Sequence, residues 1–318
     1  MKATAIAGSN IAFIKYWGNQ DDDLRIPMNG SISMTLDAAH TTTSVEFSPT
    51  LSADRFTLNG NLDNGEATSR VTRHLDHIRR LANTEMKAEV RSENSFPTGA
   101  GIASSASGFA ALTVAASEAL GLDMTKSELG RIARLGSGSA CRSIDGGFVE
   151  WRPGESHEDS FAEPIAPADH WDLVDIVAII SSEHKAYGSS AGHTLAHSSP
   201  FYQARLRRVG DSLARVRQAI LDKNFAALGR LIEEEAIQLH VTAMTSTPSV
   251  LYWQAGTLNV IHALREWRDN DPAVAGFFTI DAGANVHIIA ERKAVPALLE
   301  RLEAIDGVEE TLVSSIGG

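Results

Sequence analysis

The chain has 318 residues, of which 43% are hydrophobic and 21% charged, and its formal net charge is −12 at pH 7. This length predicts two packed lobes, because one hydrophobic core seldom grows beyond about 250–300 residues. The sequence has no apolar run of the roughly 18 residues that a membrane span needs. The acidic balance excludes broad binding to nucleic acid or to an anionic membrane, because both need a cationic surface.

The cysteine content and the start of the chain indicate the compartment. Cys141 is the single cysteine, so an internal disulfide framework is excluded, and alone it cannot build a thiolate metal site. It is interpreted as a small buried residue rather than a reactive thiol. The first residues, MKATAIAGSNIAF, lack the pattern of a cleaved signal segment. We therefore expect a cytoplasmic protein.

The first part of the chain is predicted to begin with strands and to continue with helices. Short runs of β-branched and aromatic residues, broken by Gly, Asn and Asp, predict strands within 4–18, 31–47 and 54–60. Helical spacing of apolar residues predicts a helix over 67–83, with its histidines, His74 and His77, at the surface or boundary. A capping box of Thr125 and Glu128 predicts the start of a further helix, which ends at Gly136.

The rest of the chain is predicted to be mainly helical between strands. The expected strands are 146–151 and 171–180, the expected helices are 199–220, 224–245, 250–269 and 295–305, and a strand, turn and strand are expected over 276–290. The Pro-rich acidic segment 152–170 predicts a surface loop or lobe boundary. Strands and helices in grouped runs predict an α+β fold, which we divide into lobes 1–170 and 171–318.

The segment 97–108, PTGAGIASSASG, places small residues before the apolar stretch FAALTVAASEALG. A helix start exposes unpaired N–H groups and the positive end of the peptide dipole, so this segment is typical of a phosphate-binding loop. Ser104 and Ser105 would cap the helix and offer hydroxyls to phosphate or magnesium. Taken alone, the segment slightly favours a tight turn before a well-capped helix over a phosphate-binding loop. It is neither a Walker loop nor a dinucleotide fingerprint.

Several motifs together carry a family resemblance. PTGAGIASSASG resembles the phosphate-binding motif of the GHMP kinase superfamily. With NIAFIKYWGN near the start, GSGSACRSIDGGFVEW at 136–151 and IDAGANVH at 280–287, the chain resembles the mevalonate diphosphate decarboxylase family. PMNGSISMTL, SSEHKAYGSSAGH and QLHVTAMTSTPSVLYW extend the similarity over nearly the whole chain. The resemblance implies a two-lobed GHMP kinase fold with the active-site cleft between the lobes.

The resemblance also implies a reaction and its cofactors. The family transfers the γ-phosphoryl group of ATP to the tertiary hydroxyl of a phosphorylated mevalonate, and then expels that phosphate together with carbon dioxide. Magnesium is expected to bridge the ATP phosphates, with Ser105 as a possible protein ligand. The residues expected to bind ATP are Pro97, Gly99, Gly101, Ser104, Ser105 and Ser107.

Three residues match the catalytic positions of the family. Asp281 would orient the hydroxyl and accept its proton, although an aspartate before Gly283 could also serve only a turn. Lys15 would keep that carboxylate ionised, and alone it would be an ordinary lysine at the end of a strand. Arg142 would hold the substrate carboxylate through a planar guanidinium.

Further residues are expected to contact substrate. Tyr16, beside Trp17, could equally be core packing, and the GSGSACRS segment could be only a link between helices. No acidic ligand pattern accompanies His184, His193 and His197, so they are interpreted as solvated or substrate-edge residues rather than a metal site. The residues expected to bind substrate are Asn10, Tyr16, Ser137, Gly138, Ser139, Arg142, Ser190 and His193.

The sequence departs from the family pattern at the phosphate end of the substrate. Asn19 stands where a lysine is usual, Ser190 where bacterial members tend to carry arginine, His193 where methionine is usual, and Ala284 where proline is usual. Fewer cations favour a substrate with less charge. We therefore predict mevalonate 5-phosphate as the substrate and isopentenyl phosphate as the product. The family resemblance implies that the enzyme is a homodimer. The diphosphate enzyme, a kinase without decarboxylation and a catalytically silent ligand sensor are the alternatives.

Overall fold

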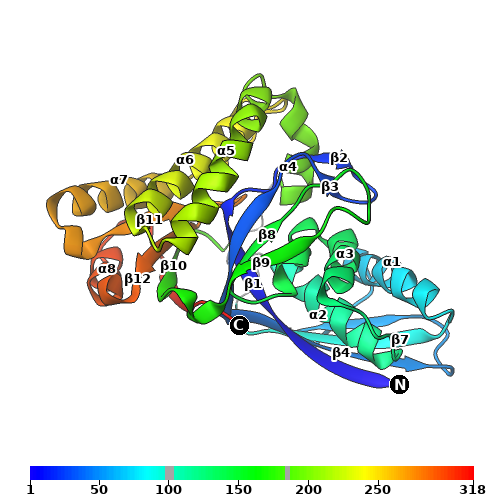
Figure 1. Cartoon of the computed structure of the whole chain (residues 1–318). Coiled ribbons are helices and arrows are strands. Elements are labelled where there is room, and N and C mark those ends of the chain that lie inside the picture. Colours follow the sequence, from blue (N-terminus) through cyan, green and yellow to red (C-terminus); the bar gives the residue numbers. More distant parts are fainter. Residues whose placement is uncertain (97–103, 183–186) are drawn as a thin grey trace.

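The computed structural model describes residues 1–96, 104–182 and 187–318. Within them, strands and helices form two main sheets with helices packed on both, as Figure 1 shows along the colour gradient from blue to red. The prediction of an α+β fold is confirmed. In the described ranges no helix is long and apolar enough to cross a membrane.

The first half of the chain forms a seven-stranded sheet in the order β6-β5-β7-β4-β8-β9, with β1 paired to β4. β1 and β4 run antiparallel from the pair Lys2 and Glu46 to the pair Ile14 and Ile32. The strands are β1 (Lys2–Ile14), β4 (Ser31–Ser48), β5 (Arg55–Leu58), β6 (Asn61–Asp63), β7 (Lys87–Asn94), β8 (Phe148–Trp151) and β9 (Ala162–Ala166). A small separate ribbon is formed by β2 (Asn19–Asp21) and β3 (Ile26–Pro27).

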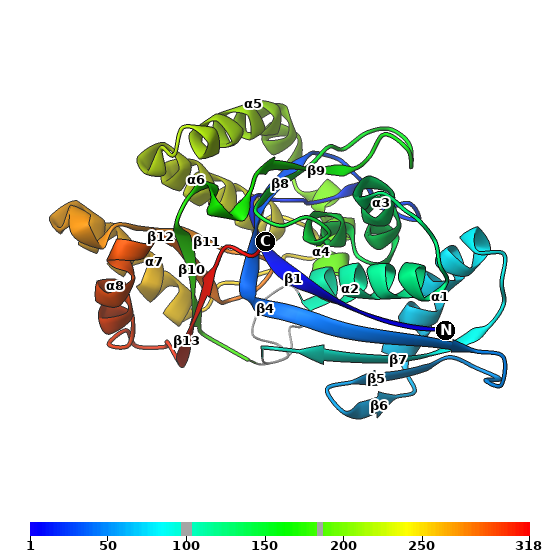
Figure 2. The same cartoon turned by 60° about the horizontal axis from the view of Figure 1, so that its bottom comes forward.

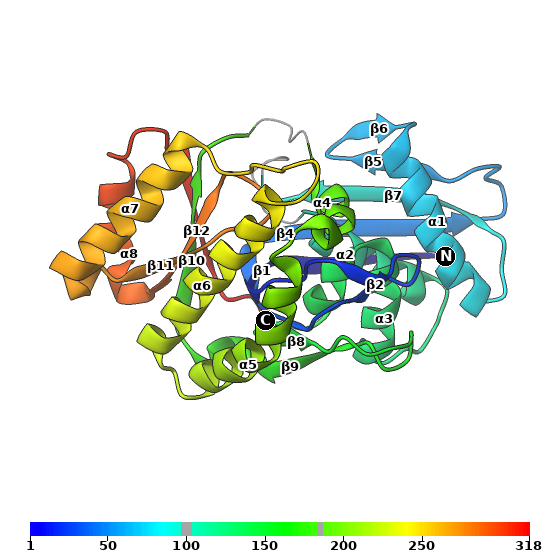
Figure 3. The ribbon, with the colours of Figure 1, turned by 90° about the horizontal axis from the view of Figure 1, so that it is seen from above.

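Three helices lie on this sheet: α1 (Glu66–Leu81), α2 (Ser104–Ala119) and α3 (Lys126–Gly136). α2 is rich in alanine and serine, and these small side chains let it pack closely on β1 and β4 (Figure 3). α3 begins with the predicted capping box of Thr125 and Glu128. It ends at Gly136, where an added Cβ would lie 2.1 Å from the ring of Phe109 on α2. Only glycine therefore allows this close approach, from which the short helix η1 (Gly138–Ser143) continues.

The second half forms an antiparallel sheet in the order β11-β12-β10-β13. Its strands are β10 (Leu173–Ile179), β11 (Gly276–Thr279), β12 (Val286–Glu291) and β13 (Glu310–Ser315). Its α-helices are α4 (Ser189–Leu195), α5 (Tyr202–Leu221), α6 (Phe225–Met244), α7 (Ala255–Asn270) and α8 (Val295–Leu302). The 3₁₀ helices η2 to η5 span Ala168–His170, Ala196–Ser198, Pro272–Val274 and Arg292–Ala294.

One hydrophobic core joins the two sheets. It combines Phe13 of β1 and Met34 of β4 with Val177 of β10 and Ile289 of β12, and the inner faces of α5 and α6 close it. Burial of this shared apolar surface fixes the two halves against each other. The site residues described below extend from this junction.

The C-terminal residues also belong to the first sheet. Leu36 of β4 forms a bridge with Ile316, and Gly317 accepts a hydrogen bond from Gly147 N–H while donating its own N–H to the carbonyl of Thr35. Figure 2 shows the C-terminus beside β1 and β4. Residues 316 and 317 thus return to the sheet of the first half.

The structure differs from the sequence-based expectations in a few elements. The segment 152–170, expected to be a surface loop or lobe boundary, contains the edge strand β9, which pairs with β8 and includes Pro164. An edge strand tolerates proline because one side of its backbone makes no ladder hydrogen bonds. His74, expected at the surface or boundary, is buried, and its Nε2 lies 2.8 Å from the hydroxyl of Thr113. Burial lowers the pKa of His74 to about 3, so the ring packs as a neutral group.

Candidate active site

The centre of the candidate site is an ion pair between the two halves of the chain. Lys15 directly follows β1, and Asp281 lies in the turn between β11 and β12. The Lys15 Nζ donates to Asp281 Oδ1 at 2.6 Å. The lysine side chain is 2% exposed, whereas the aspartate side chain is 30% exposed. Gly283 N–H also donates to the Asp281 carbonyl, so the turn exists and the carboxylate still points to Lys15.

The surroundings act on both partners of this pair. Burial lowers the pKa of Lys15, while the carboxylates of Asp281 and Glu235 oppose that change. Burial alone would raise the pKa of Asp281, but Lys15, His287 and Arg142 together hold it below its usual value. Asp281 is therefore ionised at neutral pH and can accept a hydrogen bond from a substrate hydroxyl.

The main chain of Lys15 is held by two helices from the other half of the chain. Glu235 of α6 accepts a hydrogen bond from Lys15 N–H at 3.2 Å, and Arg205 of α5 donates to the Lys15 carbonyl at 2.8 Å. Asn29 donates to the same carbonyl at 2.9 Å. Arg205 and Glu235 form a short ion pair with each other. Both polar groups of this peptide segment are thus satisfied by side chains.

Arg142, on η1, is a buried cation with neutral partners. Its guanidinium donates to the hydroxyls of Ser33, at 3.0 Å, and Ser31, and to Asn10 Oδ1 at 3.1 Å. Within the described ranges, no carboxylate forms an ion pair with it. A buried charge is costly without a counter-charge. The arrangement therefore suits an anionic ligand, such as a carboxylate, in front of the guanidinium.

Other predicted substrate residues surround Arg142. Asn10 is 3% exposed, and its amide donates to the Ser143 hydroxyl at 2.8 Å and to the Ser139 carbonyl at 3.2 Å. Its hydrogen bonds fix the guanidinium and η1 relative to β1. Ser137 and Gly138 are buried at the junction of α3 and η1. An added Cβ at Gly138 would lie 2.5 Å from the Tyr16 ring, so glycine lets Tyr16 approach η1.

Tyr16 packs within an aromatic group. Its ring centroid lies 4.7 Å from that of Trp151 and 4.1 Å from that of His193. His193 Nδ1 accepts a hydrogen bond from Gly18 N–H at 2.8 Å, and burial lowers its pKa to about 3. The neutral imidazole therefore packs against Tyr16. The Tyr16 hydroxyl donates to Asn19 Oδ1 in a short hydrogen bond.

The predicted phosphate loop is described only from the start of α2 onward. Ser104 is the first residue of α2, and the hydroxyl of Ser105 lies 3.1 Å from that of Ser137. Ser107 is buried, with its hydroxyl 2.7 Å from Thr41 Oγ1 on β4. Pro97, Gly99 and Gly101 lie outside the described residues. The start of α2 thus lies next to η1, which carries Arg142.

The remaining predictions concern Ser190, two histidines, the metal site and Cys141. Ser190 lies exposed on α4, and His197 is exposed while His184 lies outside the described residues. Where the structure describes the chain, no group of three His, Cys, Asp or Glu side chains is arranged to hold a metal. Cys141 is buried, and burial raises the pKa of its thiol to about 12, which confirms its interpretation as an inert buried residue.

The sequence matches two related families, one in each half. Residues 7–162 match the diphosphomevalonate decarboxylase-like N-terminal domain, and residues 175–315 match the mevalonate 5-diphosphate decarboxylase C-terminal domain. The phosphomevalonate decarboxylase of Haloferax volcanii is 36% identical over 100% of this chain and 96% of its own length. The chain belongs to the mevalonate diphosphate decarboxylase family. The diphosphomevalonate decarboxylase of Ganoderma lucidum is 34% identical over 94% of this chain and 80% of its own.

Solved structures of the decarboxylase family extend the similarity to the fold. The mevalonate diphosphate decarboxylase of Staphylococcus aureus has a TM-score of 0.95 at 39% identity, covering 100% of this chain and 96% of that one. MDDEF in complex with MVAPP, AMPPCP and magnesium has a TM-score of 0.94 at 40% identity, covering 100% and 97%. These matches confirm the expected two-lobed fold. This chain is accordingly an ATP-dependent decarboxylase of the mevalonate pathway.

Sequence reasoning about this decarboxylase missed the residues that hold the site together. Arg205 and Glu235 lie on helices where charged residues usually face solvent, so spacing alone does not mark them. The sequence pattern around Ser31 and Ser33 could have identified these two residues. They alternate with apolar residues along β4, which places both hydroxyls on one face of the strand, where they accept from Arg142.

Proposed function

We propose that this enzyme decarboxylates mevalonate 5-phosphate, consuming ATP and giving isopentenyl phosphate, carbon dioxide, ADP and phosphate. The observation that carries the assignment is the absence of a cation at Asn19. Its amide donates to the Asp22 carboxylate at 2.7 Å, and its carbonyl oxygen accepts from Tyr16. A lysine at that position would supply a positive charge, whereas here the neighbour is a carboxylate. Asn19 thus supplies no positive charge for an additional phosphate, which favours the less charged substrate.

The diphosphate is the second candidate substrate. It is supported by the matched solved structures named as mevalonate diphosphate decarboxylases, at 39–40% identity. The monophosphate is supported by the similarity to the Haloferax volcanii phosphomevalonate decarboxylase along the whole chain. The absence of a positive charge at Asn19, beside the Asp22 carboxylate, makes us favour the monophosphate.

The contacts of the catalytic residues support the roles that we propose for them. In our proposal, Arg142 holds the substrate carboxylate, because its buried guanidinium has only neutral partners. Asp281 accepts the proton of the tertiary hydroxyl as that oxygen bonds to the γ-phosphorus of ATP. Lys15 keeps Asp281 ionised and fixes its direction. When phosphate leaves and the carboxylate carbon departs as carbon dioxide, the electron pair of the broken carbon–carbon bond forms the new double bond. The leaving phosphate takes the proton from Asp281, whose carboxylate is then negative again and stabilises the positive charge that develops at the tertiary carbon.

The start of α2 fits a nucleotide phosphate. Ser104 and Ser105 begin the helix, whose N-terminal N–H groups and dipole favour an anion. The Ser105 hydroxyl is half-buried beside Ser137, within reach of a ligand shared with η1. Magnesium, when bound with ATP, would neutralise phosphate charge. Ser105 is its candidate protein ligand, and the phosphate oxygens would supply most of the coordination.

Steady-state kinetics with ATP and magnesium on the two substrates tests this proposal. We expect a higher kcat/KM for mevalonate 5-phosphate than for mevalonate 5-diphosphate, with equal amounts of ADP and carbon dioxide released. A higher kcat/KM for the diphosphate would refute the substrate assignment. ADP formed without carbon dioxide would instead indicate a kinase. The homodimer and the cytoplasmic location stay predictions.

A further inference from the structure

A buried pair of opposite charges lies directly behind the ion pair of the candidate site. Arg205 of α5 and Glu235 of α6 contact each other with both side chains 2% exposed. Burying two charges costs desolvation free energy that their attraction often fails to recover, so such a pair is weak support for a stabilising role. The neighbours of this pair indicate another role.

Both members of the pair bind the peptide segment of one residue, Lys15. Glu235 Oε1 accepts from Lys15 N–H at 3.2 Å, and Arg205 Nη2 donates to the Lys15 carbonyl at 2.8 Å. Arg205 also donates to Asn29 Oδ1 at 3.1 Å, and Asn29 donates to the same Lys15 carbonyl. The pair therefore fixes the backbone from which the Lys15 side chain reaches Asp281.

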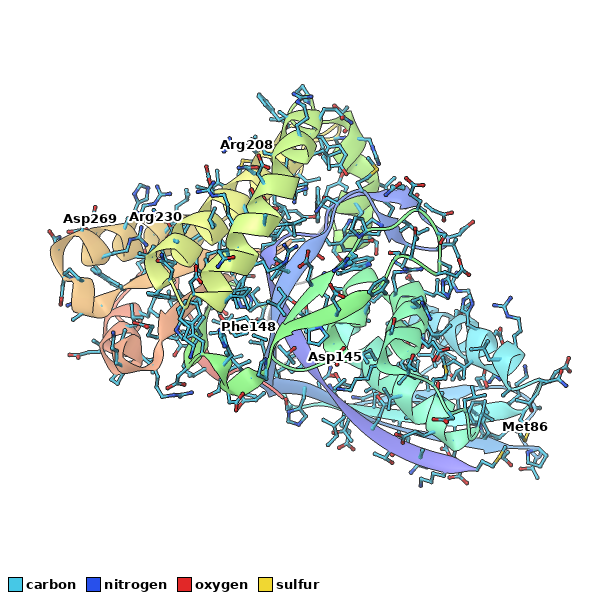
Figure 4. The ribbon with its side chains drawn as sticks, viewed as in Figure 1. Met86, Asp145, Phe148, Arg208, Arg230 and Asp269 are labelled. Carbon is cyan, nitrogen blue, oxygen red and sulfur yellow. The ribbon has the colours of Figure 1, made fainter. Side chains whose placement is uncertain are left out.

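The same two helices offer a comparison pair one residue along α6. Arg208 of α5 lies 3.2 Å from Glu234 of α6, with the two side chains 62% and 48% exposed. Figure 4 labels Arg208 on the outer side of α5. This exposed pair links α5 to α6 without contacting Lys15. An ion pair between α5 and α6 therefore exists without Arg205 and Glu235, so linking the two helices does not explain why this second pair is buried.

We propose that Arg205 and Glu235 are positioning residues for the reaction, which hold Lys15 against Asp281 and keep its ammonium group charged. This inference rests on the proposed role of the Lys15–Asp281 pair. Glu235 acts through its negative charge and Arg205 through its hydrogen bonds to the backbone. Neither residue is a catalytic residue, because Lys15 stands between them and Asp281.

The charges around Lys15 give the proposal a pH signature. The charged and titratable groups around Lys15 come from four parts of the fold. Asp281 lies in the turn after β11, and Arg142 lies on η1. Arg205 lies on α5, and Glu235 and the buried His240 lie on α6. Burial and Arg142 lower the pKa of Lys15, and Asp281 and Glu235 raise it. Loss of the Glu235 charge therefore lowers the pKa of Lys15 further. The ammonium then loses its proton at a lower pH.

The test compares Glu235→Gln with Glu234→Gln in the full-length enzyme. Glutamine keeps the oxygen that accepts from Lys15 N–H but removes the charge. For Glu235→Gln we expect the alkaline limb of the kcat profile to move to lower pH by about one unit or more. We expect kcat to fall more than KM rises. Glu234→Gln should leave the limb and kcat unchanged, since its partner Arg208 is exposed.

Two further variants keep the proposal falsifiable. Where Glu235→Gln fails to fold because Arg205 is left unpaired, the double variant Arg205→Gln/Glu235→Gln removes both buried charges, and its limb should shift in the same direction. A folded variant of either kind with the wild-type alkaline limb would overturn the positioning role. Lys15→Met separates the two hypotheses: retained turnover in Lys15→Met would overturn the proposed role of Lys15 itself.

Discussion

The candidate site contains two buried cations with opposite surroundings. Lys15 faces the carboxylate of Asp281 at 2.6 Å and has Glu235 at its main chain. Arg142 is bound by Ser31, Ser33 and Asn10, which are all neutral. The Lys15 ammonium is hydrogen-bonded to its counter-charge before substrate arrives, whereas Arg142 is attracted to Asp281 at longer range and donates its hydrogen bonds to neutral groups. The comparison indicates that the Lys15 side of the site is preorganised and that the Arg142 side receives the anionic ligand.

Removing the negative charge of Asp281, the partner of Lys15, should lower the catalytic rate more than any other change. Asp281→Asn keeps the size of the side chain and leaves no base for the hydroxyl proton. We expect kcat to fall by about 10²- to 10⁴-fold. Nucleotide binding should be largely retained, since Asp281 lies in another part of the chain from the start of α2. Release of carbon dioxide and ADP gives the rates, and titration with a nucleotide analogue gives the binding. Turnover near the wild-type rate would contradict the assignment of Asp281.

Changing the geometry of the Arg142 cation without changing its charge should have the next largest effect. Lysine cannot reproduce the planar set of donors that now contacts Ser33, Ser31 and Asn10. We expect Arg142→Lys to lower kcat/KM by about 10²-fold, mostly through a higher KM for the phosphorylated mevalonate. Steady-state kinetics at saturating ATP measures this. An unchanged KM for this substrate would show that the guanidinium does not bind its carboxylate.

Adding a cation at residue 19, a position other than those of Lys15 and Arg142, should have the smallest effect on catalysis. Asn19→Lys places an ammonium near Tyr16 and the Asp22 carboxylate, at a half-buried position. We expect the ratio of kcat/KM for the diphosphate to that for the monophosphate to rise by about fivefold to tenfold. The ratio is measured with both substrates under the same salt conditions, since screening reduces the effect. A ratio that does not change would remove residue 19 from substrate selection.

Local patterns in the sequence predicted those features that depend on neighbouring residues. The capping box of Thr125 and Glu128 falls where the sequence places it. The turn at Asp281 forms too, as the motif before Gly283 suggests. Each of these features depends on interactions between residues that are close in sequence, so a short stretch of sequence is enough to predict it.

The three consecutive glutamates of α6 show that local sequence patterns do not predict the surroundings of a side chain in the folded protein. In sequence they are one acidic run, which is typical of a solvated helix face. In the structure, Glu233 pairs with Arg268 of α7, Glu234 is exposed beside Arg208, and Glu235 is buried against Arg205. Successive residues of a helix point about 100° apart, so their surroundings are decided by what packs on each side. That packing involves segments distant in sequence.

The return of the chain end to the first sheet bears on the order of folding. The Ser314 hydroxyl donates to Asp37 Oδ1 at 3.0 Å across 277 residues of sequence, and Gly317 bonds to Thr35 and Gly147. During synthesis, β4 therefore lacks these contacts until residues 314–317 have left the ribosome. Contacts over such separations carry a large loop-closure entropy and slow folding. An isolated fragment of residues 1–170 would leave this part of β4 uncovered and open to pairing with other chains.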